Sequence, residues 1–163
     1  MISSKSFFRK NLKLIEIEIF SYCNRVCWFC PNSFIDRRTS NTEMQDVHYE
    51  KIIKDLAEIE YSGELTYSRY NEPLSHRDIF IRRVKQARQA LPNAILRTNS
   101  NGDYVTRDYI EELNDVGFNQ LWIQQYLGNN EKYNHDRVRK VMNMKVKKLD
   151  LPFNIITDIE NCR

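Results

Sequence analysis

The sequence predicts an α/β fold in which parallel strands alternate with helices. Two observations predict it. Short apolar or alternating segments recur along the chain, and each of the first four is followed by a segment with helical spacing. Strands that alternate with helices form right-handed βαβ units and a parallel sheet. The length of 163 residues indicates a single domain, residues 1–163, with one ordinary core.

The first predicted strand covers residues 12–20, LKLIEIEIF, where apolar and charged residues alternate with one slip of phase. The segment SYCNRVCWFCPN follows it directly and is predicted to be a loop, because Pro31 opposes continuation into a helix. A helix is then predicted over residues 47–60, closed by Gly63. Its apolar positions have helical spacing: Tyr49, Ile52, Ile53, Leu56 and Ile59.

The next two strands and helices follow the same order. ELTYSRY, residues 64–70, predicts a second strand, and residues 78–91 predict a helix that Pro92 ends. AILRTN, residues 94–99, predicts a third strand. A helix over residues 106–116 follows, with Thr106 as its N-cap and Gly117 as its stop.

The last part of the chain continues the alternation less strongly. NQLWIQQY, residues 119–126, predicts a fourth strand. Residues 131–144 are a weaker, strongly basic helix candidate, and FNIITDI, residues 153–159, predicts a fifth strand. The basic positions around 137–148 fit a solvent-exposed face. The more specific alternative is that they bind an anionic substrate.

Charge and hydropathy exclude some classes of function. The formal charge is +3, from 25 basic and 22 acidic residues, which is too even to indicate a nucleic-acid partner. The first 20 residues contain no uninterrupted apolar stretch of the signal-peptide kind, because Glu16 and Glu18 interrupt it. No segment approaches the roughly 20 apolar residues of a membrane span. We therefore expect a cytoplasmic protein without a membrane partner.

Three of the four cysteines lie within eight residues, at Cys23, Cys27 and Cys30, with the spacing C-x3-C-x2-C. In a reducing compartment such spacing indicates metal or redox chemistry rather than disulfides. A structural zinc ion needs four ligands, and neither His48 nor Cys162 has finger-like spacing to supply the fourth. A four-iron cluster normally takes four cysteines, so three leave one iron open, as a catalytic or substrate-binding site requires.

Other polar residues follow the later strands of the predicted sheet. Glu72 comes after the second strand, and Asn99 and Gln124 stand at the ends of the third and fourth. Because the carboxyl ends of parallel strands meet at one edge, we expect these residues and the cysteines to converge there. Simpler roles stay open: Glu72 as a helix cap, and Asn99 with Asn101 as turn residues.

The segment CNRVCWFC resembles the signature of the radical S-adenosylmethionine (SAM) superfamily, C-x3-C-x-aromatic-C, with Phe29 in the aromatic position. SRYNEPL, residues 68–74, resembles the Gly-Gly-Glu segment after the second strand. TNSNG, residues 98–102, resembles the Thr-Asn-Gly turn after the third. The resemblance covers about residues 13–126. Two departures stand out: Tyr70 and Asn71 replace the two glycines, and glutamines replace a serine near the ribose.

The resemblance implies a partial (β/α) barrel, usually of six strands, of which we count five. Since the sequence stops just after the fifth, we expect a core that is incomplete at its C-terminal end. It also implies that Cys23, Cys27 and Cys30 hold a [4Fe-4S] cluster and that SAM chelates the open iron. One electron would cleave SAM to a 5′-deoxyadenosyl radical, which abstracts hydrogen from a substrate.

The resemblance implies roles for further residues and partners. Glu72 would receive the SAM amino group. The other SAM contacts would come from Phe29, Asn71, Asn99 and Gln124. The expected partners are an electron donor such as flavodoxin or ferredoxin, and a small-molecule or peptide substrate. One alternative of another class stays open: a catalytically inactive cluster- or zinc-binding module that serves as a partner subunit.

Overall fold

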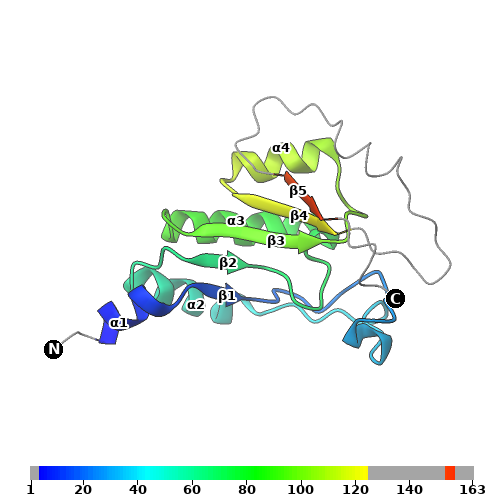
Figure 1. Ribbon diagram of the computed structural model, residues 1–163, viewed down its shortest axis with the longest axis horizontal. Helices are drawn as coiled ribbons and strands as arrows, with labels where there is room; N and C mark the ends of the chain where they lie inside the picture. Colours follow the sequence, from blue (N-terminus) through cyan, green and yellow to red (C-terminus); the bar gives the residue numbers. More distant parts are fainter. Residues whose placement is uncertain (1–3, 125–152, 157–163) are drawn as a thin grey trace.

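The structure is a computed structural model that describes residues 4–124 and 153–156. Within them one parallel sheet has the strand order β1-β2-β3-β4-β5, the order of the chain (Figure 1). The strands are β1 (Leu14–Glu16), β2 (Glu64–Thr66), β3 (Ile95–Ser100), β4 (Gln120–Gln124) and β5 (Phe153–Ile156). The α/β fold with parallel strands is therefore confirmed.

Helices connect these strands as the periodicity predicts. The α-helices are α1 (Ser4–Asn11), α2 (Asp46–Glu58), α3 (Arg77–Ala90) and α4 (Arg107–Asp115). Two short 3-10 turns, η1 (Pro31–Ser33) and η2 (Pro73–Ser75), lie in the loops after β1 and β2. Thr106 caps α4 as predicted, because its side chain accepts a hydrogen bond from the backbone N–H of Tyr109. The helix predicted over residues 131–144 lies outside the described residues.

Two predicted strands are too long. The first, predicted over residues 12–20, pairs with β2 only over Leu14–Glu16. The chain beyond it leaves the ladder: Ile17 still donates to the carbonyl of Thr66 at 2.8 Å, and the chain then bends at Ile19, whose carbonyl accepts from Met44 instead. Strand β2 likewise ends at Thr66, not at residue 70.

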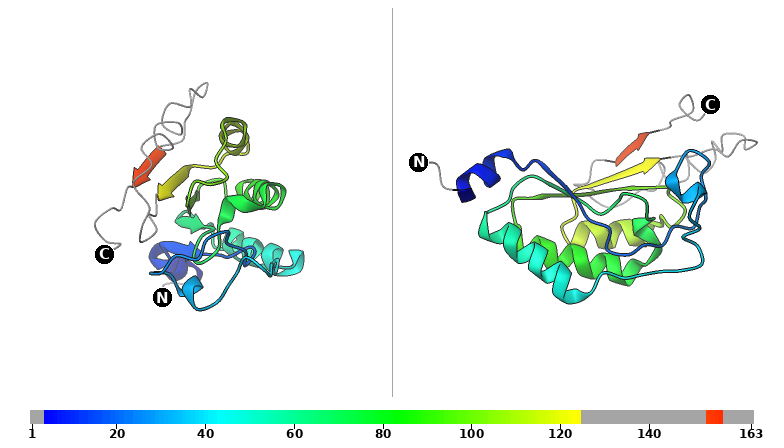
Figure 2. Two further views of the ribbon diagram at one scale, coloured as in Figure 1. Left: turned by 90° about the vertical axis from the view of Figure 1, so that its right-hand side faces the viewer. Right: turned by 90° about the horizontal axis from the view of Figure 1, so that it is seen from below.

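Helix α1 was not predicted. Its eight residues lie beside the amino ends of the strands (Figures 1 and 2). Phe7 and Phe8 are adjacent on it and more than half exposed. Because these side chains are not part of the core, the segment lacks the long apolar periodicity by which a helix is usually recognised.

The core lies between the sheet and helices α2, α3 and α4, which all cover the same face (Figure 2). Successive strand residues point to opposite faces, so Leu65, Leu96 and Leu121 point to the helices and are fully buried. Arg83 is also fully buried in α3. Its guanidinium lies 4.6 Å from the centre of the Tyr49 ring, and it donates to the Met44 carbonyl and to the Asp46 carboxylate. A buried cation is tolerated because it is paired in this way.

The opposite face of the sheet is covered by none of the described helices (Figure 2). A parallel sheet covered on both faces has strands that are apolar throughout, whereas here apolar and polar residues alternate. We call this the helix-free face. Its strand and strand-end residues are Leu14, Glu16, Glu64, Thr66, Ser68, Ile95, Arg97, Asn99, Gln120, Trp122 and Gln124. Apart from Leu14, Ile95 and Trp122 the face is polar and carries charges of both signs, so it is suited to polar ligands and not to a packed apolar core.

Candidate active site at the carboxyl ends of the strands

The cysteine loop between β1 and α2 lies at the carboxyl ends of the strands (Figure 1). It turns tightly, since Cys30 donates to the Cys27 carbonyl at 3.0 Å and Ser33 donates to the Cys30 carbonyl at 2.8 Å. Cys23, Cys27 and Cys30 are of intermediate burial, and none of them forms a disulfide within the described residues. Three thiols on one loop fit three of the four irons of a [4Fe-4S] cluster.

The same loop fits a single zinc ion poorly. A tetrahedral ion requires four ligands around one point. Within residues 4–124 and 153–156, no three His, Cys, Asp or Glu side chains are gathered closely enough to hold one ion. A cluster has a different requirement, because each thiolate binds a different iron atom.

Cys23 has hydrogen-bond donors aimed at its sulfur. Burial raises the pKa of its thiol, and the backbone N–H of Arg25 and the side chain of Asn32 oppose the shift. Asn32 is itself buried, and its Nδ2 also donates to the Tyr70 carbonyl at 2.8 Å. N–H donors stabilise a thiolate, which is the form that binds metal. Asn32 thus links the first cysteine to the loop after β2.

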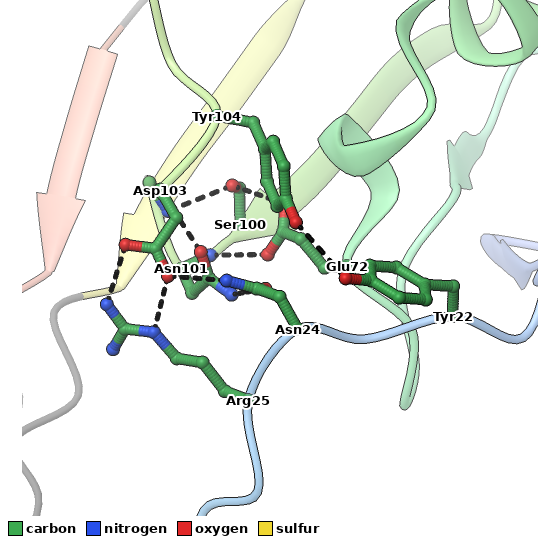
Figure 3. Close-up of polar contacts among 9 residues, drawn as sticks. Tyr22, Asn24, Arg25, Glu72, Ser100, Asn101, Asp103 and Tyr104 are labelled. Carbon is green, nitrogen blue, oxygen red and sulfur yellow. Dashed lines mark hydrogen bonds and ion pairs between the residues drawn. The ribbon is translucent and has the colours of Figure 1, made fainter. Parts of the chain in front are cut away.

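Glu72, predicted after the second strand, is 2% exposed and bridges two loops. Its carboxylate accepts hydrogen bonds from Ser100 Oγ at 2.7 Å and from the backbone N–H of Asn101 at 2.8 Å (Figure 3). It also accepts from the backbone N–H of Leu74 at 3.2 Å. Burial raises the pKa of this carboxyl group, and the three donors oppose the rise. Glu72 therefore does act as an N-cap, but it caps the short turn η2 and not helix α3.

These three hydrogen bonds leave part of the acceptor capacity of the Glu72 carboxylate unused. A carboxylate offers about four lone-pair sites, so one more donor can be accepted. The backbone N–H of Glu72 also donates to the carbonyl of Tyr22, which directly precedes Cys23. The residue therefore connects the loops after β1, β2 and β3. Its predicted contact with the SAM amino group stays a prediction.

A second set of contacts joins the cysteine loop to the loop after β3 (Figure 3). Arg25 forms a two-point ion pair with Asp103, with Nε–Oδ2 and NH2–Oδ1 distances of 2.6 and 2.8 Å. Asn24 donates to Asp103 at 2.8 Å and accepts from Asn101 at 2.8 Å. We call these four residues the loop clasp. Sequence reasoning missed it, although two polar residues between the first two cysteines were a signal.

Glu18 was also missed, and it holds the segment where the resemblance expects two glycines. Its Oε1 accepts from the backbone N–H groups of Tyr70 at 2.5 Å and Asn71 at 2.9 Å. The Asn71 side chain turns inward and bonds to the backbone of Tyr67 and Arg69. The departures from glycine are therefore accommodated by backbone contacts that satisfy both N–H groups.

A cavity of about 140 Å³ opens at the carboxyl end of the helix-free face. It brings together three predicted residues, Asn71, Asn99 and Gln124. Asn99 Oδ1 is buried and has no hydrogen-bond partner among the described residues. Phe29 does not line the cavity but lies on the cysteine loop, edge-on to Trp28. The lining is Glu16, Ser68, Arg69, Asn71, Asn99, Ser100, Asn101 and Gln124.

Comparison with known proteins identifies the family. The model of the radical SAM superfamily matches residues 17–157, most of the chain. The chain belongs to the radical SAM superfamily. The resemblance seen in the cysteine motif is therefore confirmed, and with it the cofactors of this superfamily, a [4Fe-4S] cluster and SAM. A radical SAM enzyme in general also needs a reductant and a substrate.

Known proteins are similar to this chain over most of its length. The chain is 30% identical over 145 residues to the S-adenosyl-L-methionine-dependent 2-deoxy-scyllo-inosamine dehydrogenase of Niallia circulans, covering 86% of this chain and 56% of that protein. A crystal structure of BtrN in complex with AdoMet and 2-DOIA matches with a TM-score of 0.71 and 26% identity, over 88% of this chain and 56% of BtrN. The chain thus spans about half the length of these relatives.

A more distant structure agrees on the fold. The anSMEcpe protein with bound AdoMet matches with a TM-score of 0.65 and 16% identity, over 88% of this chain and 42% of that one. Together with BtrN, it confirms the partial barrel. None of the described helices is long and apolar enough to cross a membrane.

Proposed function

We propose that this chain is the catalytic core of a radical SAM enzyme in which Cys23, Cys27 and Cys30 bind the [4Fe-4S] cluster. The observation that supports this most directly is the position of three half-buried thiols on one loop, beside a polar cavity at the carboxyl ends of the strands. When bound, the cluster and SAM supply a 5′-deoxyadenosyl radical by one-electron cleavage, and this radical abstracts hydrogen from the substrate.

The chain's own residues position the cofactors. Asn71, Asn99 and Gln124 line the cavity at the open end of the helix-free face and would contact SAM. The remaining acceptor site of Glu72 would take the SAM amino group, since an ammonium in a closed pocket needs a carboxylate partner. Phe29, on the cysteine loop, would pack beside the cluster and present its backbone to the adenine.

For the substrate we propose a small hydroxyl-bearing molecule. The curated relative acts on 2-deoxy-scyllo-inosamine by its name, and the cavity of this chain is lined by amides, hydroxyls and one ion pair. For the reductant we propose flavodoxin or ferredoxin. The cysteine loop offers such a partner exposed apolar side chains, with Phe34 91% and Trp28 43% exposed.

Anaerobic reconstitution tests the proposal. The reconstituted chain should show broad absorption near ~400 nm from the cluster, and dithionite with SAM should release 5′-deoxyadenosine. Serine at Cys23, Cys27 or Cys30 should abolish the absorption, while Cys162→Ser, a cysteine outside the motif, should keep it. A colourless protein holding one zinc ion would contradict the proposal. A cluster without deoxyadenosine would favour the inactive binding module.

A further inference from the structure

Arg97 lies on the helix-free face of β3, two residues before the cavity residue Asn99. It lies on β3, in register with Thr66 of β2 and Gln120 of β4. Asn99, which lines the cavity, follows two residues later on the same face, about 7 Å further along the strand. The side chain of Arg97 is 21% exposed.

The guanidinium of Arg97 is fixed in place before any ligand arrives. Its NH1 donates to Glu64 Oε2 at 2.7 Å, and its centre lies 4.9 Å from the centre of the Trp122 ring. The indole in turn donates from Nε1 to Gln120 Oε1 at 3.4 Å. An arginine held by an ion pair and an aromatic face loses little conformational freedom when it binds a ligand.

Two polar atoms on this face have no partner among the described residues. One is the donor Nε of Arg97, and the other is the acceptor Oδ1 of Asn99. Buried polar groups are nearly always hydrogen-bonded, so these two exceptions, one in the cavity lining and one two residues before it on the same face, point to a ligand that supplies the missing partners. A hydroxyl group both donates and accepts, so a molecule with several hydroxyls can satisfy both atoms.

The charges of the face argue against an anionic ligand. Arg69 pairs with Glu16 at 3.1 Å, and Arg97 pairs with Glu64 at 2.7 Å. Each of these cations is thus already neutralised by a carboxylate, and a phosphate or sulfate would meet two acidic side chains. The arrangement favours hydroxyl groups over anions.

We propose that Arg97, held by Glu64 and Trp122, is a specificity-determining residue that binds the hydroxyl oxygens of a small, hydroxyl-rich substrate without anionic groups. This inference rests on the proposed function, because it takes the helix-free face to be the substrate side of a radical SAM core. It extends the proposed function by naming the residue that selects the substrate and the class of molecule that this residue selects.

Binding measurements on the cluster-reconstituted chain with SAM present test the inference. The probes are 2-deoxy-scyllo-inosamine and myo-inositol 1-phosphate, followed by calorimetry or ligand-observed NMR. The unmodified chain should bind the inosamine and prefer it to the phosphate. Arg97→Lys keeps a cation for Glu64 but lacks Nε and the planar fork, so it should weaken inosamine binding about tenfold or more. SAM affinity and cluster absorption should not change.

Two further variants serve as comparisons for Arg97→Lys. Trp122→Phe removes the indole while leaving an aromatic ring, and should weaken inosamine binding less than Arg97→Lys does. Arg107→Gln removes an exposed arginine on α4 and should behave as the unmodified chain.

The outcomes separate the two proposals. No inosamine binding, affinity unchanged by Arg97→Lys, or a preference for the phosphate would each overturn the inference. Absence of the cluster or of deoxyadenosine would contradict the proposed function instead.

Discussion

Arg25 and Asp103 form a two-point ion pair between loops that are 78 positions apart in the sequence. Arg25 lies between the first two cysteines, and Asp103 lies in the loop after β3. Their side chains are only 22% and 24% exposed, so solvent screens the pair less than it would a surface pair. The pair therefore fixes the cysteine loop against the rest of the candidate site.

Asp103→Asn should loosen the cysteine loop. The substitution keeps the size of the side chain but removes its charge, so we expect a loss of about 1 kcal/mol in the free energy of unfolding. We also expect faster loss of the cluster under chelation, measured as decay of the absorption near ~400 nm and as iron content.

Asp36→Asn is the matched control for the clasp. Asp36 pairs with Arg38 inside the same loop and, within the described part of the chain, makes no bond to the loop after β3. It should leave cluster retention unchanged. Equal decay in both variants would mean that loss of any ion pair in the loop, and not loss of the clasp, determines retention.

Glu72→Gln should weaken SAM binding and leave the cluster in place. The amide keeps one acceptor oxygen but turns an NH2 group toward the donors from Ser100, Asn101 or Leu74. An unsatisfied buried group costs about 1–3 kcal/mol, so the free energy of unfolding should also fall by that amount. Calorimetric titration with SAM and thermal unfolding of the same sample measure the two effects.

Glu111→Gln on α4 serves as control, since Glu111 pairs with Arg107 on the same helix and, among the described residues, makes no bond to the cysteine loop. If Glu72→Gln loses stability but keeps full SAM affinity, Glu72 is a structural brace between loops and does not contact SAM.

The contacts of Asp108 should contribute to the free energy of unfolding near neutral pH, and this contribution should disappear in strong acid. The hydroxyl of Thr106 and the guanidinium of Arg77 lower the pKa of this carboxyl group from 3.8 to about 2. Since the folded pKa is below the unfolded one, the contribution is present above about pH 4 and is lost as pH falls through about 2. Urea titrations of the unmodified chain and Asp108→Asn should differ at pH 6 and converge near pH 2. A difference that persists unchanged at pH 2 would exclude this origin.

Gly63→Ala should destabilise the turn before β2. An added Cβ would lie 2.5 Å from the Lys13 carbonyl oxygen and 2.6 Å from the hydroxyl of Tyr61, which is itself hydrogen-bonded there. Overpacking of this kind costs about 1–3 kcal/mol and should lower the melting temperature by several degrees. Ser62→Ala, at the exposed neighbouring position, should change it little.

Sequence reasoning located the edge of the sheet where the site lies, because strand order and polarity are local properties. The motif placed the three cysteines after β1, and the position of Glu72 after β2 brought it to the same edge. Cavity residues Asn71, Asn99 and Gln124 were named for the same reason.

The contacts that assemble the site could not be predicted in this way. Glu18 bonding to Tyr70, and Arg25 bonding to Asp103, join residues 52 and 78 positions apart. Neither pair carries a local pattern, and many charged residues in the chain could have served equally. Strand β1 was overestimated for a related reason: Ile17, Ile19 and Phe20 are buried, but beyond Ile17 the chain bonds to partners other than β2.

The sheet separates what keeps the protein folded from what it can recognise. Leu65, Leu96 and Leu121 on the helix side tolerate little change, because each is enclosed by the core. Arg97 and Trp122 on the other side are held by an ion pair, a hydrogen bond and their mutual cation–π contact, so exchanging them should alter ligand choice without opening a cavity in the core. An evolving lineage can therefore acquire new substrates through substitutions on one side of the strands, while the other side stays fixed.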